Sequence, residues 1–361
     1  MQVAVTFCNQ HSSPRLAVCA VDLRTDERAW LPVPDAFDRG AAGITQIDTD
    51  LLVGCQPGGI VRYDRDLEVA GFLPTPEARN LHSILYRADE RALYVTSAHD
   101  DSLHRYRLGD GGRTVIDHEV VFCADPRRRG QDRYHLNSLV EWRGDLYVSM
   151  FGPSDGPTHR HRRNGQVVRV ADGAVILEGL YHPHSLHANG EELLVIESQA
   201  HTVRRVLGGP DARWHVPGGY PRGIVTAPDY RIWVGTSSLR RESSSLGTPN
   251  VIDSSSPLDF TTRLVELDLS TGEVGRTVDL TPLASEIFDV RALPAGVSFE
   301  PSPDAGLSER IAGLVESFRV ERARNRLLEK ELERSPARRL REFSARARRR
   351  FTAARAARSG R

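Results

Sequence analysis

The segment PHSLHANGEELLVIESQAHTVRRV, which begins at Pro183, is the most informative stretch for the fold class. The segment opens with a polar residue, a small residue and a few apolar residues, which lead into the turn Asn189-Gly190. An alternating apolar strand and a further strand follow the turn. Related units recur at intervals of about 40 to 55 residues, the length of a four-stranded propeller blade. Clear copies begin at Leu81, His135, Pro183 and Pro221, a weaker copy at Ala42 and a truncated one at Ile287.

Six copies predict an all-β, six-bladed β-propeller that occupies residues 1–296. The truncated sixth copy needs partner strands, and the N-terminal runs 2–7 and 16–23 have the alternating apolar pattern of strands. Pairing the two ends of the domain in one blade would remove the sheet edges that an open ring leaves exposed. We therefore expect the N- and C-terminal strands to close one blade together.

Composition and motif content limit the functional classes. The 361 residues are 39% hydrophobic and 27% charged, which is typical of a globular protein. Neither a basic, apolar leader nor a run of about 18 apolar residues occurs, so a cytoplasmic protein is expected. The four cysteines show no CxxC spacing and should be reduced and buried. Without GxSxG, P-loop or Gly-rich dinucleotide motifs, neither a serine hydrolase nor a nucleotide cofactor is supported.

The charge of the chain is unevenly distributed. Residues 301–361 contain sixteen Arg and one Lys against eight acidic residues, a net charge of about +9, which leaves the preceding residues at about −9. We predict a linker at 297–307 and an amphipathic, Arg-rich helical tail at 308–361, interrupted at Ser335-Pro336. A basic helix at 337–358 could lie on an anionic membrane surface, in which case the protein would be peripheral to the membrane. It could instead bind a protein partner, or it could simply be solvated. Nucleic acid is the least favoured partner.

The blade motifs also carry a resemblance. The units HLNSL…GDLYVSMFG, HPHSL…LLVIES, YPRGI…IWVGTSSLRRES and EIFDV resemble an uncharacterised bacterial family of six-bladed propellers. That family is itself similar to the gluconolactonase, strictosidine-synthase and NHL-type propellers. The resemblance covers roughly residues 40–296 and implies the fold, but it brings no established reaction.

Alignment of the copies on their first strand places five polar residues at one structural position. The innermost strand of each propeller blade lines the central channel, so these side chains are expected to form a ring. Its members are His82, Asn137, His184, Arg222 and Asp289, with Ala42 or Gly43 at the same point of the weak copy. Long insertions at 123–134, 152–165 and 238–262 should emerge at the same mouth, where loops commonly build binding sites.

One interpretation of the ring is a metal site for a single divalent ion. Imidazole and oxygen ligands would suit zinc, manganese or iron, and the candidate ligands are His82, Asn137, His184 and Asp289. The similar gluconolactonase-type propellers hold a metal here with an oxygen-rich set that includes a glutamate, whereas this chain has Ala42 or Gly43 at the matching point. The guanidinium of Arg222 would also repel a metal ion.

A second interpretation is a metal-free site, and a third is that the polar groups only satisfy one another and trapped water. In the metal-free site, the catalytic residues would be His82, His184, Asp289 and Glu197: a histidine would move a proton, and Asp289 or Glu197 would orient that histidine. Substrate binding would fall to Asn137, Arg222, His135 and His182.

These residues favour an enzyme that acts on a small polar molecule, anionic or carbohydrate-like, at the mouth of the channel. Lactonase, lyase or epimerase chemistry would fit, with or without a metal. The alternative is a non-catalytic propeller that binds a glycan or a protein and is localised by its basic helical tail.

Overall fold

A computed structural model describes residues 1–8, 17–34, 40–56, 58–154, 163–237, 262–281 and 286–301 of the chain. The chain divides into a unit that ends at Ser302 and a second unit that begins at Pro303. The predicted helical tail at 308–361 and most of the linker at 297–307 lie outside the described residues. No helix among the described residues is long and apolar enough to cross a membrane.

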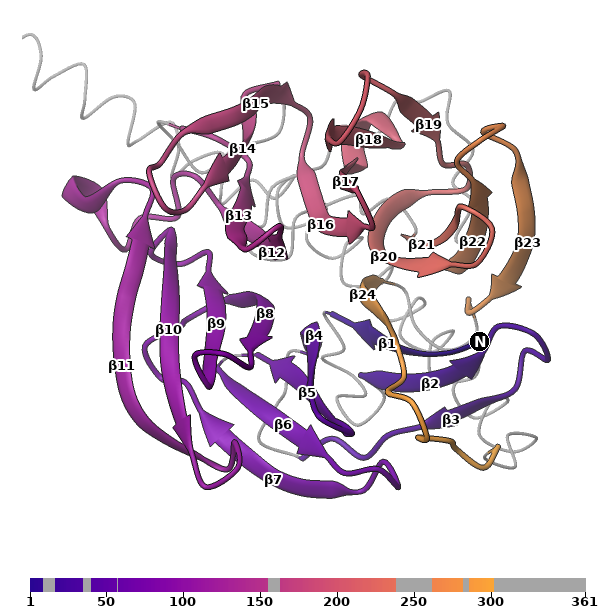
Figure 1. Cartoon of the computed structure of the whole chain (residues 1–361), viewed down its shortest axis with the longest axis horizontal. Coiled ribbons are helices and arrows are strands. Elements are labelled where there is room, and N and C mark those ends of the chain that lie inside the picture. Colours follow the sequence, from indigo (N-terminus) through magenta and orange to yellow (C-terminus); the bar gives the residue numbers. More distant parts are fainter. Residues whose placement is uncertain are drawn as a thin grey trace, which may run out of the picture. The chain divides into compact units, whose positions relative to one another are not determined.

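Six four-stranded antiparallel sheets surround a common centre, so the predicted all-β, six-bladed propeller is confirmed (Figure 1). From the inside outward, blade 1 consists of β24 (Ile287–Ala292), β1 (Gln2–Phe7), β2 (Val18–Asp22) and β3 (Arg28–Trp30). Blade 2 consists of β4 (Ala41–Ile47), β5 (Asp50–Cys55), β6 (Gly59–Tyr63) and β7 (Val69–Pro74). Blade 3 consists of β8 (Leu81–Arg87), β9 (Ala92–Ser97), β10 (Ser102–Gly109) and β11 (Thr114–Cys123).

The other three blades follow the same order along the chain. Blade 4 consists of β12 (Leu136–Trp142), β13 (Asp145–Met150), β14 (Gly165–Arg169) and β15 (Val175–Leu180). Blade 5 consists of β16 (Pro183–Asn189), β17 (Glu192–Glu197), β18 (Thr202–Leu207) and β19 (Arg213–His215). Blade 6 consists of β20 (Tyr220–Ala227), β21 (Arg231–Ser237), β22 (Arg263–Asp268) and β23 (Val274–Asp279). Two short 3-10 helices, η2 (Pro126–Arg128) and η3 (Ser198–Ala200), lie in the connections.

Blade 1 is closed by both ends of the domain, as predicted. Strand β24 pairs antiparallel with β1, with Val3 opposite Ala292 and Val5 opposite Val290. Strands β2 and β3 complete the sheet outside β1. A strand from near the end of the domain and three strands from its beginning therefore complete one four-stranded blade.

The core lies between neighbouring sheets. Every residue of β9 and of β17 is buried, whereas the outer strands β7, β15 and β23 are largely exposed. Between blades 1 and 6, for example, Val5 and Phe7 pack with Trp233 and Leu264. The four cysteines are free thiols, three of them buried and Cys123 partly buried.

Every blade interrupts its inner ladder at the same place. The pairing between the inner and the second strand shifts register near the third residue of the inner strand, in each case at a β-bulge or irregularity. A bulge leaves backbone groups without ladder partners and bends the strand that carries it. The polar residues that the sequence predicts to form a ring lie next to this bend.

Side chains of the neighbouring blade satisfy the backbone groups near the bulges. In blade 3, Thr96 Oγ1 accepts the N–H of Ser83 at 2.8 Å and donates to Asn137 O of blade 4 at 3.0 Å. A bond between a Ser or Thr hydroxyl and a backbone group crosses every junction between blades, at positions along the inner strand that differ from one junction to the next. The six bonds are Thr6 to Ala42, Thr45 to Tyr86, Thr96 to Asn137, Ser138 to Leu186, Ser185 to Gly223 and Ser237 to Ile287.

Loss of one such bond should weaken the ring measurably. In Ser138→Ala, the buried N–H of Leu186 loses the oxygen that accepts its hydrogen bond at 2.9 Å. An unsatisfied buried donor costs about 1–3 kcal/mol. We expect the free energy of unfolding, measured in urea, to fall by that amount.

The matched control is Ser83→Ala, one blade away at the equivalent position. The Ser83 hydroxyl makes no hydrogen bond with a described residue, so its loss should change stability by less than about 0.5 kcal/mol. Equal effects of the two substitutions would contradict the role of the hydroxyl bonds.

Candidate active site at the channel mouth

Three positions at or just before the start of each inner strand, spaced i, i+2 and i+3, form three rows at the channel mouth. The upper row is Gly40, Asn80, His135, His182, Tyr220 and Glu286. The middle row is Ala42, His82, Asn137, His184, Arg222 and Phe288. The lower row is Gly43, Ser83, Ser138, Ser185, Gly223 and Asp289. The lower row requires small side chains because neighbouring blades nearly touch there: a Cβ on Gly43 would lie 2.7 Å from Ile84 N.

Asp289 occupies the lower row, so the predicted alignment of the sixth copy was wrong by one residue. Ile287 and Val290 pair with β1 as Leu81 and Ile84 pair with β9, which makes Phe288 the equivalent of His82. The hydrogen bonds agree. The N–H of Asp289 donates to Thr6 Oγ1 as the N–H of the equivalent Ser83 donates to Thr96 Oγ1.

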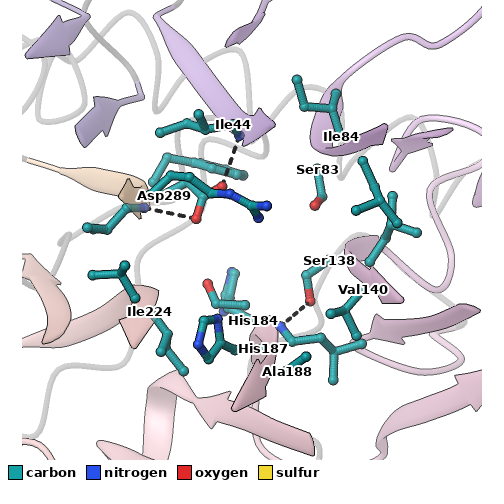
Figure 2. Close-up of a pocket in the computed structure, with 18 of the residues that line it drawn as sticks. Ile44, Ser83, Ile84, Ser138, Val140, His184, His187, Ala188, Ile224 and Asp289 are labelled. Carbon is teal, nitrogen blue, oxygen red and sulfur yellow. Dashed lines mark hydrogen bonds between the residues drawn. The ribbon is translucent and has the colours of Figure 1, made fainter. Parts of the chain in front are cut away.

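Both carboxylate oxygens of Asp289 bind backbone. Oδ2 accepts the N–H of Ile44 in blade 2 at 3.0 Å, and Oδ1 accepts the N–H of Val290 at 2.9 Å (Figure 2). The side chain therefore links blades 1 and 2. Burial raises the pKa of Asp289 to about 6, against the opposing effects of the Ile44 N–H, Arg291 and the Val290 N–H.

Aromatic and cationic side chains form a closed circuit around the mouth, which we call the mouth ring. Consecutive members lie 4.6 to 5.7 Å apart, measured between ring centroids or from the guanidinium carbon. In order around the channel, they are His82, His135, Phe151, His184, Tyr220, Arg222 and Phe288. The propeller thus brings together residues from blades 1, 3, 4, 5 and 6.

His82 and His184 share one tautomer. His82 Nδ1 lies 2.8 Å from Asn80 O, and His184 Nδ1 lies 3.0 Å from His182 O. A carbonyl oxygen only accepts, so each Nδ1 carries the proton and each Nε2 keeps its lone pair. Burial lowers the pKa of His82 to about 3, with His135 adding to the effect, and burial beside Arg222 lowers the pKa of His184 strongly. Both imidazoles are therefore neutral acceptors.

His135 differs from these two because a carboxylate holds it. Its Nδ1 lies 2.9 Å from Asp132 Oδ1, three residues earlier in the loop before β12. Burial acts to lower the pKa of His135, but Asp132 outweighs burial and the net pKa is raised. A histidine oriented by a carboxylate in this way is suited to transfer protons near neutral pH.

Arg222 and Asn137 present buried donors to the site. The Arg222 guanidinium lies over Tyr220 and Phe288, and its Nη1 is 3.8 Å from Glu286 Oε2. Arg222 Nε and Asn137 Nδ2 are buried without a hydrogen-bond partner among the described residues. Unsatisfied buried donors are costly, and at a channel mouth they indicate a ligand that carries acceptors.

His182 contacts aromatic side chains of the mouth, and Glu197 holds a backbone group. His182 stacks on Phe151 with ring centroids 4.6 Å apart, and its Nδ1 lies 3.1 Å from the hydroxyl of Tyr220. Glu197 Oε1 accepts the backbone N–H of Tyr181 at 3.2 Å. The side chain that contacts the imidazole of His184 is Ser198, at 2.8 Å.

The structure places the predicted metal ligands His82, Asn137, His184 and Asp289 in two different rows of the channel. Within the described part of the chain, no three His, Cys, Asp or Glu side chains are grouped so that they could hold one ion. Asp289 lies in the lower row with both oxygens on backbone N–H groups, while His82 and His184 lie in the middle row.

Several contributors to the mouth ring were missed in the sequence. Phe151 and Tyr220 are aromatic, whereas the alignment of the copies selected polar residues. Phe288 was not selected because the alignment of the sixth copy placed Asp289 at its position. Asp132 carried a usable signal, because it precedes His135 by three residues in a long insertion that leads directly into an inner strand.

The comparisons with known proteins agree with the fold. Residues 126–299 match the family model described as Domain of unknown function (DUF4915). No curated protein matches the sequence. Many solved structures share the propeller architecture, which confirms the predicted resemblance at the level of fold.

Three solved structures illustrate the similarity. A chain of a nidogen/laminin complex is 13% identical, with 80% of this chain and 97% of that chain covered and a TM-score of 0.55. A protein of unknown function from Bacteroides caccae is 11% identical, with coverages of 80% and 97% and a TM-score of 0.54. The periplasmic gluconolactonase of Pseudomonas aeruginosa is 16% identical, with coverages of 81% and 99% and a TM-score of 0.50. At these identities, the likeness concerns the fold alone.

The raised pKa of Asp289 makes stability depend on pH. The pKa in the folded protein, about 6, lies above the usual 3.8, so this stabilisation is present below about pH 4 and is lost as the pH rises through 6. The difference amounts to about 3 kcal/mol. The free energy of unfolding of the wild type, measured in urea, should fall by this amount between pH 4 and 7.5. In Asp289→Asn, this pH-dependent fall should be absent.

Asp66→Asn, in the exposed turn between β6 and β7, removes one carboxylate without touching the channel and serves as the control. Parallel pH profiles of the wild type and Asp289→Asn would show that the Asp289 carboxyl does not titrate in the way described.

Proposed function

We propose that the mouth ring binds a small molecule with an anionic oxygen group and hydroxyl groups, and that the protein is an enzyme that transfers a proton on this molecule. The observation that carries the proposal is the pairing of complementary groups in the middle row. Arg222 Nε and Asn137 Nδ2 are buried donors without partners, and His82 and His184 keep a lone pair on Nε2.

Each kind of group selects one part of the ligand. The planar guanidinium of Arg222 and the amide of Asn137 match the acceptor oxygens of a carboxylate or phosphate. The Nε2 atoms of the two neutral histidines can accept from hydroxyl groups. The rings of Phe151, Tyr220 and Phe288 offer apolar faces to the C–H groups of a sugar-like skeleton.

His135 is the residue best suited to move the proton. Asp132 fixes the orientation of its imidazole and raises its pKa, which favours proton exchange near neutral pH. Proton abstraction beside a carboxylate, as in lyases and epimerases, and the opening of a lactone all require one such group. The similarity to the gluconolactonase concerns the fold alone, so it does not favour one of these reactions over another.

The ligand class can be tested with a metabolite panel scored by thermal shift. We expect hydroxycarboxylates such as aldonic and uronic acids to stabilise the protein more than neutral sugars or simple dicarboxylates. Arg222→Gln should weaken binding at least tenfold, because a charged hydrogen bond is worth about 1.5–3 kcal/mol.

Arg107→Gln removes an exposed arginine from the outer part of blade 3 and is the matched control. If the hits bind Arg222→Gln as tightly as they bind the wild type, the mouth ring is not their site. Hits that bind at the ring but are never converted would instead favour the non-catalytic glycan-binding or protein-binding alternative.

The role of His135 can be tested without knowing the substrate. In Asp132→Asn, the neutral amide no longer favours the imidazolium, so the pKa of His135 should fall below its value in the wild type. Titration of the histidine C–H resonances by NMR measures this directly. For any panel compound that is converted, the acidic limb of the kcat/KM profile should move to lower pH by the same amount. An unchanged profile would exclude His135 as the base.

A further inference from the structure

A second polar space lies beneath the mouth ring. A cavity of about 330 Å³ runs along the inner strands from the middle row toward their C-terminal ends, and we call it the chamber. His82, Asn137 and His184 form its upper end, whereas Arg222, His135 and Tyr220 do not line it. Figure 2 shows Ser83, Ser138, His187 and Asp289 around the chamber.

The chamber contains one cation that is not paired. Arg291 lines it and is an exposed residue, and no ion pair joins its guanidinium to a carboxylate of the described residues. Glu141, the other charged residue of the lining besides Asp289, is 3.3 Å from Arg87 and is already paired. An unpaired guanidinium in a confined, polar space is a binding site for an anion.

The remaining polar groups of the chamber leave the charge of Arg291 uncompensated. Thr226 donates to Asn189 Oδ1 at 2.9 Å and therefore accepts from His187 Nε2 at 2.7 Å. His187 is thus protonated at Nε2, and its pKa is lowered to about 3 by burial and then by Arg291, so its ring is neutral. The hydroxyl of Ser83 makes no hydrogen bond to a described residue and can donate.

We propose that the chamber is a second ligand site, which adjoins the mouth ring at His82, His184 and Phe288 and binds one small carboxylate or comparable oxyanion against the guanidinium of Arg291. The proposal does not rest on the function proposed for the mouth. The volume suits an anion of a few heavy atoms together with water. The hydroxyls of the lower row can complete the hydrogen bonding of the anion.

Asp289 links this site to pH. Its carboxylate, when ionised, is an internal anion beside Arg291 and competes with the external one. The strands that pack against β24 add few other charges: β1 and β4 have no titratable residue, β20 has Tyr220 and Arg222 at the mouth end, and β21 has Arg231. Across the chamber lie His82, His184, His187 and Glu141.

The pKa of Asp289 sets an upper limit on the change in the affinity for the anion between pH 5 and pH 7.5. With a pKa of about 6, Asp289 is mostly neutral at pH 5 and mostly ionised at pH 7.5. If the anion binds only when Asp289 is neutral, its apparent Kd becomes about 30-fold weaker at pH 7.5 than at pH 5. Asp289→Asn should remove this difference.

The test uses sodium formate and sodium nitrate, whose charges are the same at both pH values. A bulky organic sulfonate too large for the chamber keeps the ionic strength constant. Calorimetric titration and thermal shift of the full chain should give saturable binding that is tighter at pH 5. Arg291→Gln should abolish the binding that is tighter at pH 5, Arg291→Lys should retain it in weakened form, and Arg107→Gln should leave it unchanged.

Arg222→Gln separates the two sites. We expect it to leave formate binding in the chamber intact, whatever it does to the hydroxycarboxylates at the mouth. Formate binding that is unaffected by Arg291→Gln, or the absence of saturable binding up to about 100 mM, would overturn the proposal of a chamber site while leaving the mouth ring untouched.

Discussion

The hydrogen bonds that cross from blade to blade at the bulges are the constraint on which the rest of this propeller depends. Hydrophobic packing between sheets holds neighbouring blades together, but it is non-directional and would tolerate sliding. A hydroxyl such as that of Thr96, which bonds Ser83 of its own blade and Asn137 of the next, fixes the register of one inner strand against another. Because a hydroxyl-to-backbone bond crosses each of the six junctions, every blade is tied to both of its neighbours.

The candidate site follows from the matched position of the bulges. The bulges lie at one height, so the residues next to them meet around the channel although they are far apart in sequence. His82 and His184 occur in different blades, yet both donate Nδ1–H to the carbonyl two residues earlier and keep Nε2 unprotonated. The carbonyl groups of Asn80 and His182 fix the tautomers of these two histidines. The Nε2 atoms are therefore neutral acceptors beside the unpaired donors of Arg222 and Asn137.

Most of the fold could be predicted from the sequence, since period-two alternation and turn residues recur in every copy. The polar residues of the inner strands could also be predicted wherever a copy was complete. The truncated copy failed because its partner strand, β1, lies at the other end of the chain, so nothing local fixed the register of Phe288 and Asp289. Contacts such as Asp132 with His135, or Ser198 with His184, depend on side-chain directions that no spacing rule specifies.

The most direct test of the central claim is an experimental structure of a crystal soaked with a hydroxycarboxylate that stabilises the protein. We expect the carboxylate to lie within hydrogen-bond distance of Arg222 and Asn137, and hydroxyl groups of the ligand to donate to the Nε2 atoms of His82 and His184. A ligand bound elsewhere, with Arg222 Nε and Asn137 Nδ2 satisfied by neighbouring protein groups, would contradict it.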